Sequence, residues 1–165
     1  MNGKYIFLSD QDDIWNENKV KNVLDKFEKT NSTLIVHNAE IVDENLKPIY
    51  PDSTFKWRNS GKGIMKNIIK NSYIGCCIAF DSSLKKYILP IPNNIEMHDQ
   101  WIGIISEKYG KNCFIVDELI KYRRHNDNAS EMKHHKMKRM IKNRAIFLEE
   151  YCKRKREIKK NECAI

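Results

Sequence analysis

Long apolar runs, glycine-rich or proline-rich tracts and Cys-x-x-Cys motifs are all missing from this sequence of 165 residues. The longest apolar runs, such as 74–80, are far shorter than the roughly 20 residues that a membrane span needs. No charged-then-apolar leader precedes a cleavage site, so we expect a cytosolic protein. Six Gly and four Pro argue against collagen-like and low-complexity chains, and 41% hydrophobic residues suffice for the core of one globular domain.

The five cysteines are odd in number and contain no Cys-x-x-Cys pair, which argues against a disulfide framework and a zinc knuckle. Positive charge is concentrated at one end of the chain. Residues 131–165 hold 12 Lys and Arg against 5 Asp and Glu, an excess of +7, whereas residues 1–130 have an excess of only +1. A basic tail on a near-neutral body favours an anionic surface as partner, and an ordinary solvated helix face is the alternative.

Hydrophobic periodicity divides the chain into strands and helices, which predicts an α/β fold. Strands are predicted at 5–9, at 33–36 with a continuation to 42, and at 74–80, 113–116 and 119–122. Helices are predicted at 18–29, 64–70 and 101–109, with a helical turn after Asp81 and a long loop at 48–62. We expect a domain at 1–128 and a basic amphipathic helical tail at 129–165. The apolar stripe of the tail consists of Met137, Met140, Ile141, Ala145, Leu148, Tyr151 and Cys152.

Three carboxylates, Asp10, Asp12 and Asp13, directly follow the first predicted strand. Concentrating this much negative charge costs Coulomb energy unless a cation is bound, and hard divalent metals with phosphate oxygens are the usual solution. Acids at a helix start and a solvated loop are the alternative explanation. The carboxyl end of a strand in an open α/β sheet is where ligands bind, which favours a site. The glycine and terminal glutamate of a calcium loop are absent.

This acidic strand end resembles the D-x-D segment of family 2 glycosyltransferases of the rhamnosyltransferase-like branch. The resemblance starts with Tyr5-Ile-Phe-Leu-Ser-Asp-Gln-Asp-Asp-Ile-Trp15, followed by Lys19. Segments 71–80, 89–92 leading to 97–101, and 122–128 then occur in the family's order, so the resemblance covers about residues 3–128. It implies a GT-A fold, a nucleotide-sugar donor, and Mg²⁺ or Mn²⁺ that holds the donor diphosphate.

The resemblance also implies roles for individual residues. Asp12 matches the direct metal ligand, with Asp10 and His125 as further metal ligands. Asp13, Arg123 and Arg124 are assigned to the donor and its diphosphate, where guanidinium groups pair with phosphate.

Asp99 matches the catalytic base of inverting enzymes, although an Asp before a helical pattern is by itself more often an N-cap. Gly75, His98 and Trp101 match the acceptor side.

Members of this family begin with a strand–helix–strand region that binds the base and ribose, whereas here Met1 lies just ahead of the D-x-D strand. We therefore expect a partial GT-A domain that lacks the amino-terminal half and that self-associates or relies on a separate amino-terminal chain. The isolated chain is expected to bind nucleoside diphosphate weakly, with little discrimination among bases, and whether it is active stays open. Two alternatives stay open: a non-catalytic interaction module that keeps the fold, and a D-x-D phosphatase with Asp10 as nucleophile.

The reaction that the resemblance implies is an inverting transfer of a sugar to a cell-surface glycan or lipid-linked acceptor. We expect a cytoplasmic protein that is peripheral at the inner membrane face, with the basic tail on an anionic membrane surface. No nucleic-acid partner is expected.

Overall fold

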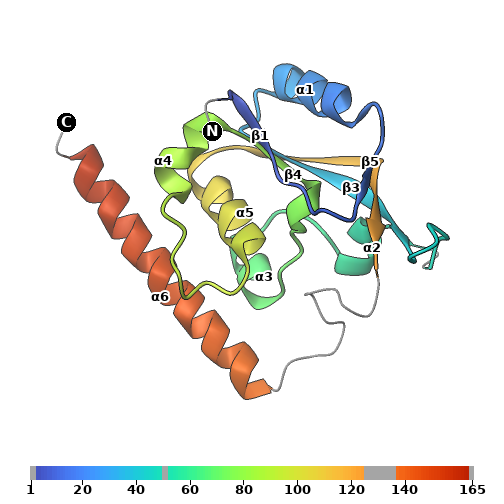
Figure 1. The fold of residues 1–165 in the computed structure, drawn as a ribbon. Helices are drawn as coiled ribbons and strands as arrows, with labels where there is room; N and C mark the ends of the chain where they lie inside the picture. The colour runs from blue at the N-terminus through green and yellow to red at the C-terminus, as the bar shows by residue number, and fades with distance from the viewer. Residues whose placement is uncertain (1–2, 50–51, 125–136, 164–165) are drawn as a thin grey trace.

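The structure is a computed structural model that describes residues 3–49, 52–124 and 137–163. Its centre is a curved five-stranded sheet with the strand order β1-β4-β3-β5-β2 (Figure 1). The strands are β1 (Tyr5–Phe7), β2 (Ile14–Trp15), β3 (Leu34–Val42), β4 (Ile78–Asp81) and β5 (Asn112–Arg123). Strands β3 and β5 are parallel, and the other neighbouring pairs are antiparallel.

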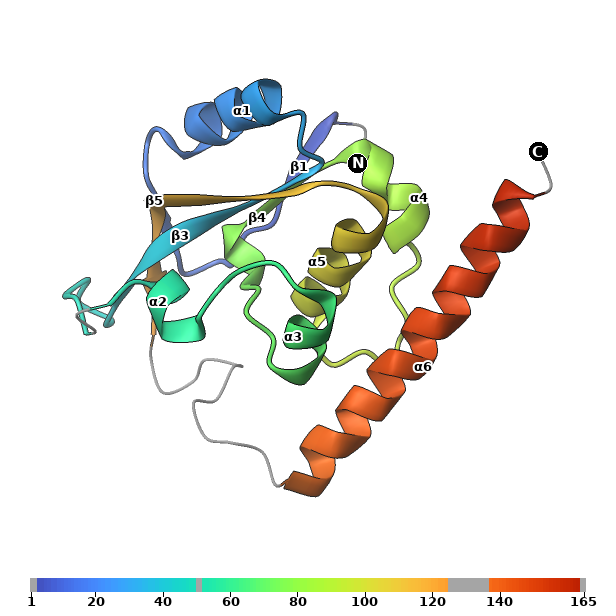
Figure 2. The same cartoon turned by 180° about the vertical axis from the view of Figure 1, so that it is seen from behind.

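Helices cover both faces of the sheet. They are α1 (Lys19–Thr30), α2 (Thr54–Arg58), α3 (Ile64–Ile69), α4 (Lys85–Ile88), α5 (His98–Tyr109) and α6 (Met137–Glu162), with 3₁₀ turns η1 (Gly75–Cys77) and η2 (Ser82–Leu84). Helix α1 lies on one face, whereas α3, α4 and α5 lie on the other, with the long α6 outside them (Figures 1 and 2). This arrangement confirms the predicted α/β class and the C-terminal helix.

Helix α1 shows how local sequence produces one of these elements. Lys19, Val23 and Phe27 are spaced four residues apart, so they share one face, and all three are buried. The Phe27 ring stacks on Tyr5 of β1 with 4.5 Å between centroids. The helix ends at Asn31, whose left-handed backbone (φ 50°) lets its N–H donate to the carbonyl of Phe27.

Four predicted segments differ from the structure. The two strands predicted at 113–116 and 119–122 are one strand, β5, whose register against β3 shifts around Asn38. The first of these irregularities absorbs the extra residues Val116 and Asp117, which are exposed. The strand predicted at 74–80 begins as the 3₁₀ turn η1 and becomes extended only at Ile78.

The long loop predicted at 48–62 contains helix α2. Its first turn is supported from β3, because Asn38 Oδ1 accepts hydrogen bonds from the Thr54 hydroxyl and the Phe55 N–H, each at 3.0 Å. This long-range support satisfies amide and hydroxyl groups that a short isolated helix would leave to water. A helix held in this way has no periodic signal in the sequence.

Helix α6 confirms the predicted tail helix from Met137 onward, but a different face packs against the body. The buried residues are Phe147, Tyr151, Arg154 and Ile158, so that only Tyr151 of the predicted stripe is buried. Phe147 meets the Trp101 ring edge-on at 5.8 Å. The residues 132–136, also predicted as helix, lie outside the described part of the chain. No described helix combines the length and the apolar character needed to cross a bilayer.

Candidate active site

Two acidic side chains and one thiol meet where β1 ends. Asp10 and Asp13 follow β1, and Cys76 belongs to η1, which leads into the neighbouring strand β4. One carboxylate oxygen of each Asp and the Cys76 Sγ all lie within 4.8 Å of one another. We name these three residues the Asp–Cys cluster. Asp12 is half-buried and is not one of the three, so its role as the direct metal ligand stays a prediction. His125 lies outside the described residues.

Asp13 is the most constrained member of the Asp–Cys cluster. Its Oδ1 accepts a hydrogen bond from the backbone N–H of Arg123 at 3.1 Å, which joins the strand end to the far end of β5. Its Oδ2 is withdrawn from solvent and has no hydrogen-bond partner within the described part of the chain. Burial raises the pKa of Asp13, and the Cys76 thiol and the Arg123 N–H only partly oppose this rise. A half-buried carboxylate with one unpaired, solvent-shielded oxygen beside a second acid fits a bound cation.

Lys19 supports the Asp–Cys cluster through a hydrogen bond to the backbone of Cys76. From the sequence, Lys19 was named only as the residue that follows the D-x-D segment. Its side chain is fully buried, and Nζ donates to the Cys76 carbonyl at 3.0 Å and lies 3.8 Å from the centroid of the Trp15 ring. Burial lowers the Lys19 pKa to about 8, opposed by the nearby thiols and by Asp13 and Asp10. Its position on the apolar face of α1 is a signal that sequence reasoning could have used.

Asp99 lies in the first turn of α5 and is held in place from two sides. Its Oδ1 accepts hydrogen bonds from the Gln100 N–H at 2.7 Å and from Asn71 Nδ2 at 3.2 Å. The N-cap residue is Met97, so the alternative explanation of Asp99 as an N-cap does not hold. Burial raises the pKa of Asp99, and the Gln100 N–H, His98, Arg58 and Asn71 oppose the rise.

Gly75 brings the predicted acceptor-side residues together. A Cβ atom at Gly75 would lie 3.3 Å from His98 Nε2 and 3.9 Å from the Asp99 Cβ, so the turn η1 lies directly against the start of α5. The next residue along the turn, Cys76, belongs to the Asp–Cys cluster. One short turn therefore separates the acidic strand end from the predicted base Asp99.

An aromatic and cationic group flanks this site, and it joins the predicted Arg124 to Arg58, which the sequence did not single out. Arg58, on α2, lies 4.3 Å from the centroid of the Trp57 ring, and Arg124, after β5, lies 5.7 Å from the same ring. Burial lowers the pKa of Arg58, opposed by Tyr122 and by the negative charge of Asp99. Arg58 was missed because it falls in the segment predicted to be a loop.

Trp101 is not part of this group, which corrects its predicted position on the acceptor side. The ring is completely buried, and its Nε1 donates to the carbonyl of Ile88 at 3.0 Å. Trp101 is two residues after Asp99 in α5, so the two side chains leave the helix on roughly opposite sides. Trp101 therefore points into the core while Asp99 faces the turn η1. The helical period of α5 therefore makes Trp101 a packing residue with no surface to offer a sugar.

The family model described as Glycosyl transferase family 2 matches residues 1–90, which is more than half of the chain and includes the whole Asp–Cys cluster. Asp99 and Arg123 lie beyond the matched residues. A comparison with curated proteins gave no match. The mixed α/β sheet with its C-terminal helix is consistent with a partial GT-A fold.

Proposed function

The chain belongs to glycosyl transferase family 2, and from this membership we propose that it transfers a sugar from a nucleotide-diphosphate donor to a glycan or lipid-linked acceptor, with inversion at the anomeric carbon. The four segments shared with the rhamnosyltransferase-like branch support a place in that branch. The product class that we propose is a cell-surface polysaccharide.

The observation that carries the proposal is the position of η1 between two carboxylate groups. Gly75 faces His98 and Asp99 so closely that an added Cβ would contact them, and Cys76 meets Asp10 and Asp13 on the other side. A transfer from a nucleotide-sugar needs a base for the acceptor hydroxyl and a place for the leaving diphosphate, separated by the length of a sugar. In this proposal, one side of the turn is the base and the other is the place for the diphosphate.

Asp99 is the base in this proposal. Its carboxylate would take the proton from the acceptor hydroxyl as the oxygen attacks the anomeric carbon and the bond to the diphosphate breaks. Burial raises its pKa toward the range where proton transfer is efficient, and Asn71 holds the carboxylate in a fixed orientation. His98 is exposed beside Gly75 and is proposed to contact the acceptor.

The acidic side of the turn is proposed to bind the donor diphosphate. Asp10 and Asp13 would hold a divalent cation, to which the family resemblance adds Asp12, and such a cation stabilises negative charge on the leaving diphosphate. Arg123 and Arg124 at the end of β5 add positive charge, as does Arg58, and guanidinium groups suit phosphate oxygens. His125, which follows them in the sequence, is proposed to lie with the diphosphate.

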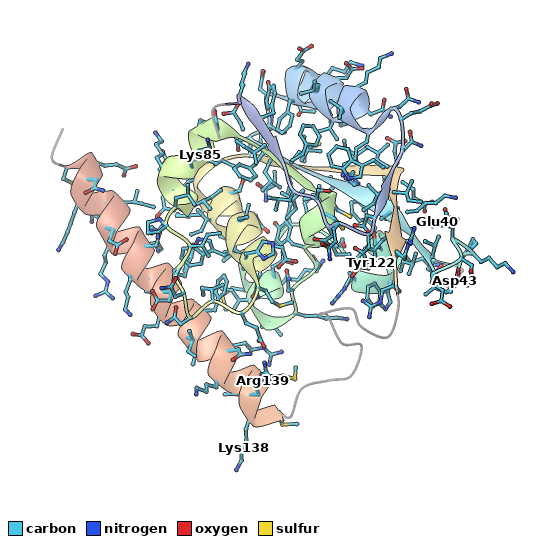
Figure 3. The ribbon with its side chains drawn as sticks, in the orientation of Figure 1. Glu40, Asp43, Lys85, Tyr122, Lys138 and Arg139 are labelled. Carbon is cyan, nitrogen blue, oxygen red and sulfur yellow. The ribbon has the colours of Figure 1, made fainter. Side chains whose placement is uncertain are left out.

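We also propose that the exposed face of α6 rests on an anionic membrane surface at the cytoplasmic side. Met137, Ile141 and Leu148 are exposed there, between several Lys and Arg side chains. Figure 3 shows Lys138 pointing away from the body of the protein. Apolar residues flanked by basic ones are typical of helices at the surface of anionic bilayers.

Incubation of the chain with Mn²⁺ and a panel of nucleotide-sugars tests the proposed function. We expect release of nucleoside diphosphate from at least one donor, measured by chromatography and increased by a glycan or lipid-linked acceptor. Asp99→Asn should suppress this release, whereas Asp117→Asn, a change at an exposed acid on β5, should leave it unchanged. Absence of release from every donor would contradict the proposal and favour an interaction module.

A further inference from the structure

We propose that the thiolate of Cys76 is a direct ligand of the divalent cation, together with Asp10 and Asp13, and that the site therefore prefers thiophilic metals over Mg²⁺. This inference rests on the proposed function only in that both involve a divalent cation in the same place. It goes beyond the acidic segment that the sequence singled out, because Cys76 is more than 60 residues further along the chain.

The geometry of the Asp–Cys cluster suits one ion. Its three ligand atoms lie within 4.8 Å of one another. Ligands on bonds of about 2.0–2.3 Å to one tetrahedral ion are about 3.3–3.8 Å apart, so side-chain shifts of at most about 1 Å complete the site. The two elements that carry the cluster are fixed, because β1 pairs with β4 and Lys19 Nζ holds the Cys76 carbonyl at 3.0 Å.

A second observation points to a ligand at this position. Asp13 Oδ2 is buried and, among the described residues, lacks any hydrogen-bond partner. A carboxylate oxygen removed from water is costly unless a donor or a cation faces it. Cys76 is fully buried, whereas Asp10 is exposed, so a cation has a path into the cluster from the Asp10 side.

Coordination by Cys76 has a chemical signature that carboxylates lack. The S–H bond breaks, a sulfur–metal bond forms, and the proton leaves to solvent, so that binding releases about one proton per metal ion at neutral pH. Thiolate ligands favour Zn²⁺, Co²⁺ and Cd²⁺, whereas Mg²⁺ requires oxygen ligands in octahedral geometry. We therefore expect Cd²⁺ and Co²⁺ to bind at least about tenfold more tightly than Mg²⁺.

The competing explanation is that the Cys76 thiol only donates a hydrogen bond to Asp13. Absorption spectroscopy of the full chain titrated with Cd²⁺ or Co²⁺ separates the two, because a sulfur ligand produces a charge-transfer band that oxygen ligands do not. All titrations use a parent variant with Cys152→Ser and Cys163→Ser. These two thiols are exposed, one on α6 and one just after it, and would bind Cd²⁺ on their own. Calorimetry in the same buffer gives the affinities for Cd²⁺ and Mg²⁺.

We expect the band in this background and its loss after Cys76→Ser, with Cd²⁺ affinity reduced about 10- to 100-fold and Mg²⁺ affinity little changed. Cys113→Ser, at a half-buried thiol on β5, is the matched control and should keep the band. Asp10→Asn, at an exposed position, should weaken the binding of both Cd²⁺ and Mg²⁺ without disturbing the fold. Metal binding without the band, or a band that survives Cys76→Ser, would overturn the inference while leaving the proposed sugar transfer intact. Absence of any metal binding would overturn it as well.

Discussion

The Tyr73 ring lies against Gly103 so closely that a Cβ atom at Gly103 would be 2.4 Å from Tyr73 Cε2. The Tyr73 hydroxyl donates to Glu107 Oε1 at 2.5 Å and accepts from Asn112 Nδ2 at 3.0 Å. Tyr73 thus joins α5 to β5 just ahead of the turn η1. This contact sets the distance between α5, which carries Asp99, and the segment that carries Gly75 and Cys76.

Gly103→Ala should therefore destabilise the protein, although alanine is ordinarily better than glycine within a helix by about 1 kcal/mol. The added methyl group has no space, because the Tyr73 ring is buried and held by two hydrogen bonds. We expect a loss of about 1–3 kcal/mol in the free energy of unfolding, measured by urea denaturation. Gly61→Ala is the control, since its nearest neighbour is the flexible end of Lys66 at 3.3 Å. A gain in stability for Gly103→Ala would contradict this contact.

Arg154 fixes α6 to the body of the protein. Its guanidinium donates to the carbonyl oxygens of Tyr87, Leu89 and Pro90, at 2.6, 3.2 and 2.6 Å. Arg154→Met keeps much of the side-chain volume but removes these donors, so we expect a loss of at least about 1–3 kcal/mol in the free energy of unfolding. Arg156→Met, at an exposed position on the same helix, should cost much less. Equal stability of the two variants would mean that α6 is not held through Arg154.

The rate of sugar transfer should depend on the protonation of Asp99. Asp99→Asn should lower turnover by about 10²–10⁴-fold with donor binding retained, because a general base acts only on the chemical step. His98→Ala should have a milder effect. Because burial raises the pKa of Asp99, and the base works in its deprotonated form, the rate should fall with decreasing pH from a higher pH than for an ordinary aspartate.

Asn71→Ala refines this test. The hydrogen bond from Asn71 Nδ2 favours the charged form of the Asp99 carboxylate. Removal of this hydrogen bond should raise the Asp99 pKa further and move the acid limb of the pH–rate profile to higher pH. Asn45→Ala, at an exposed turn position, should leave the profile unchanged. An acid limb that stays in place in Asn71→Ala, or full activity of Asp99→Asn, would identify another group as the base.

Binding of the chain to anionic vesicles should require the exposed face of α6. The side chains of Ile141 and Leu148 are 57% and 39% exposed, so glutamate at both positions should reduce binding without disturbing the core. Binding should also weaken with increasing salt because basic side chains contribute to it. Met65→Glu on α3, where Met65 is 62% exposed, is the control for surface hydrophobicity in cosedimentation assays. Unchanged binding of the double variant would exclude this face.

Local patterns in the sequence were sufficient to predict many of the helices and strands. The helices α1, α3 and α5 follow from apolar residues at helical spacing, because that period alone decides which side chains share a face. The position of Asp10 and Asp13 at the end of a buried strand was predicted on the same basis. The basic tail was correctly predicted as a helix, but its packed face was wrong, since two neighbouring faces of α6 both carry apolar residues.

Only the tertiary structure decided which of these elements meet. The short helix α2 depends on Asn38 of β3, and the continuity of β5 depends on irregular pairing with the same strand. The meeting of Cys76 with Asp10 and Asp13 requires β4 to pair beside β1. Such contacts join residues far apart in the chain, and the composition and period of each segment contain no information about its distant partner. The sequence by itself determined the acidic strand end and the helix after Asp99, whereas the tertiary structure extended that helix to His98 and placed Asp99 and the acidic strand end on either side of one turn.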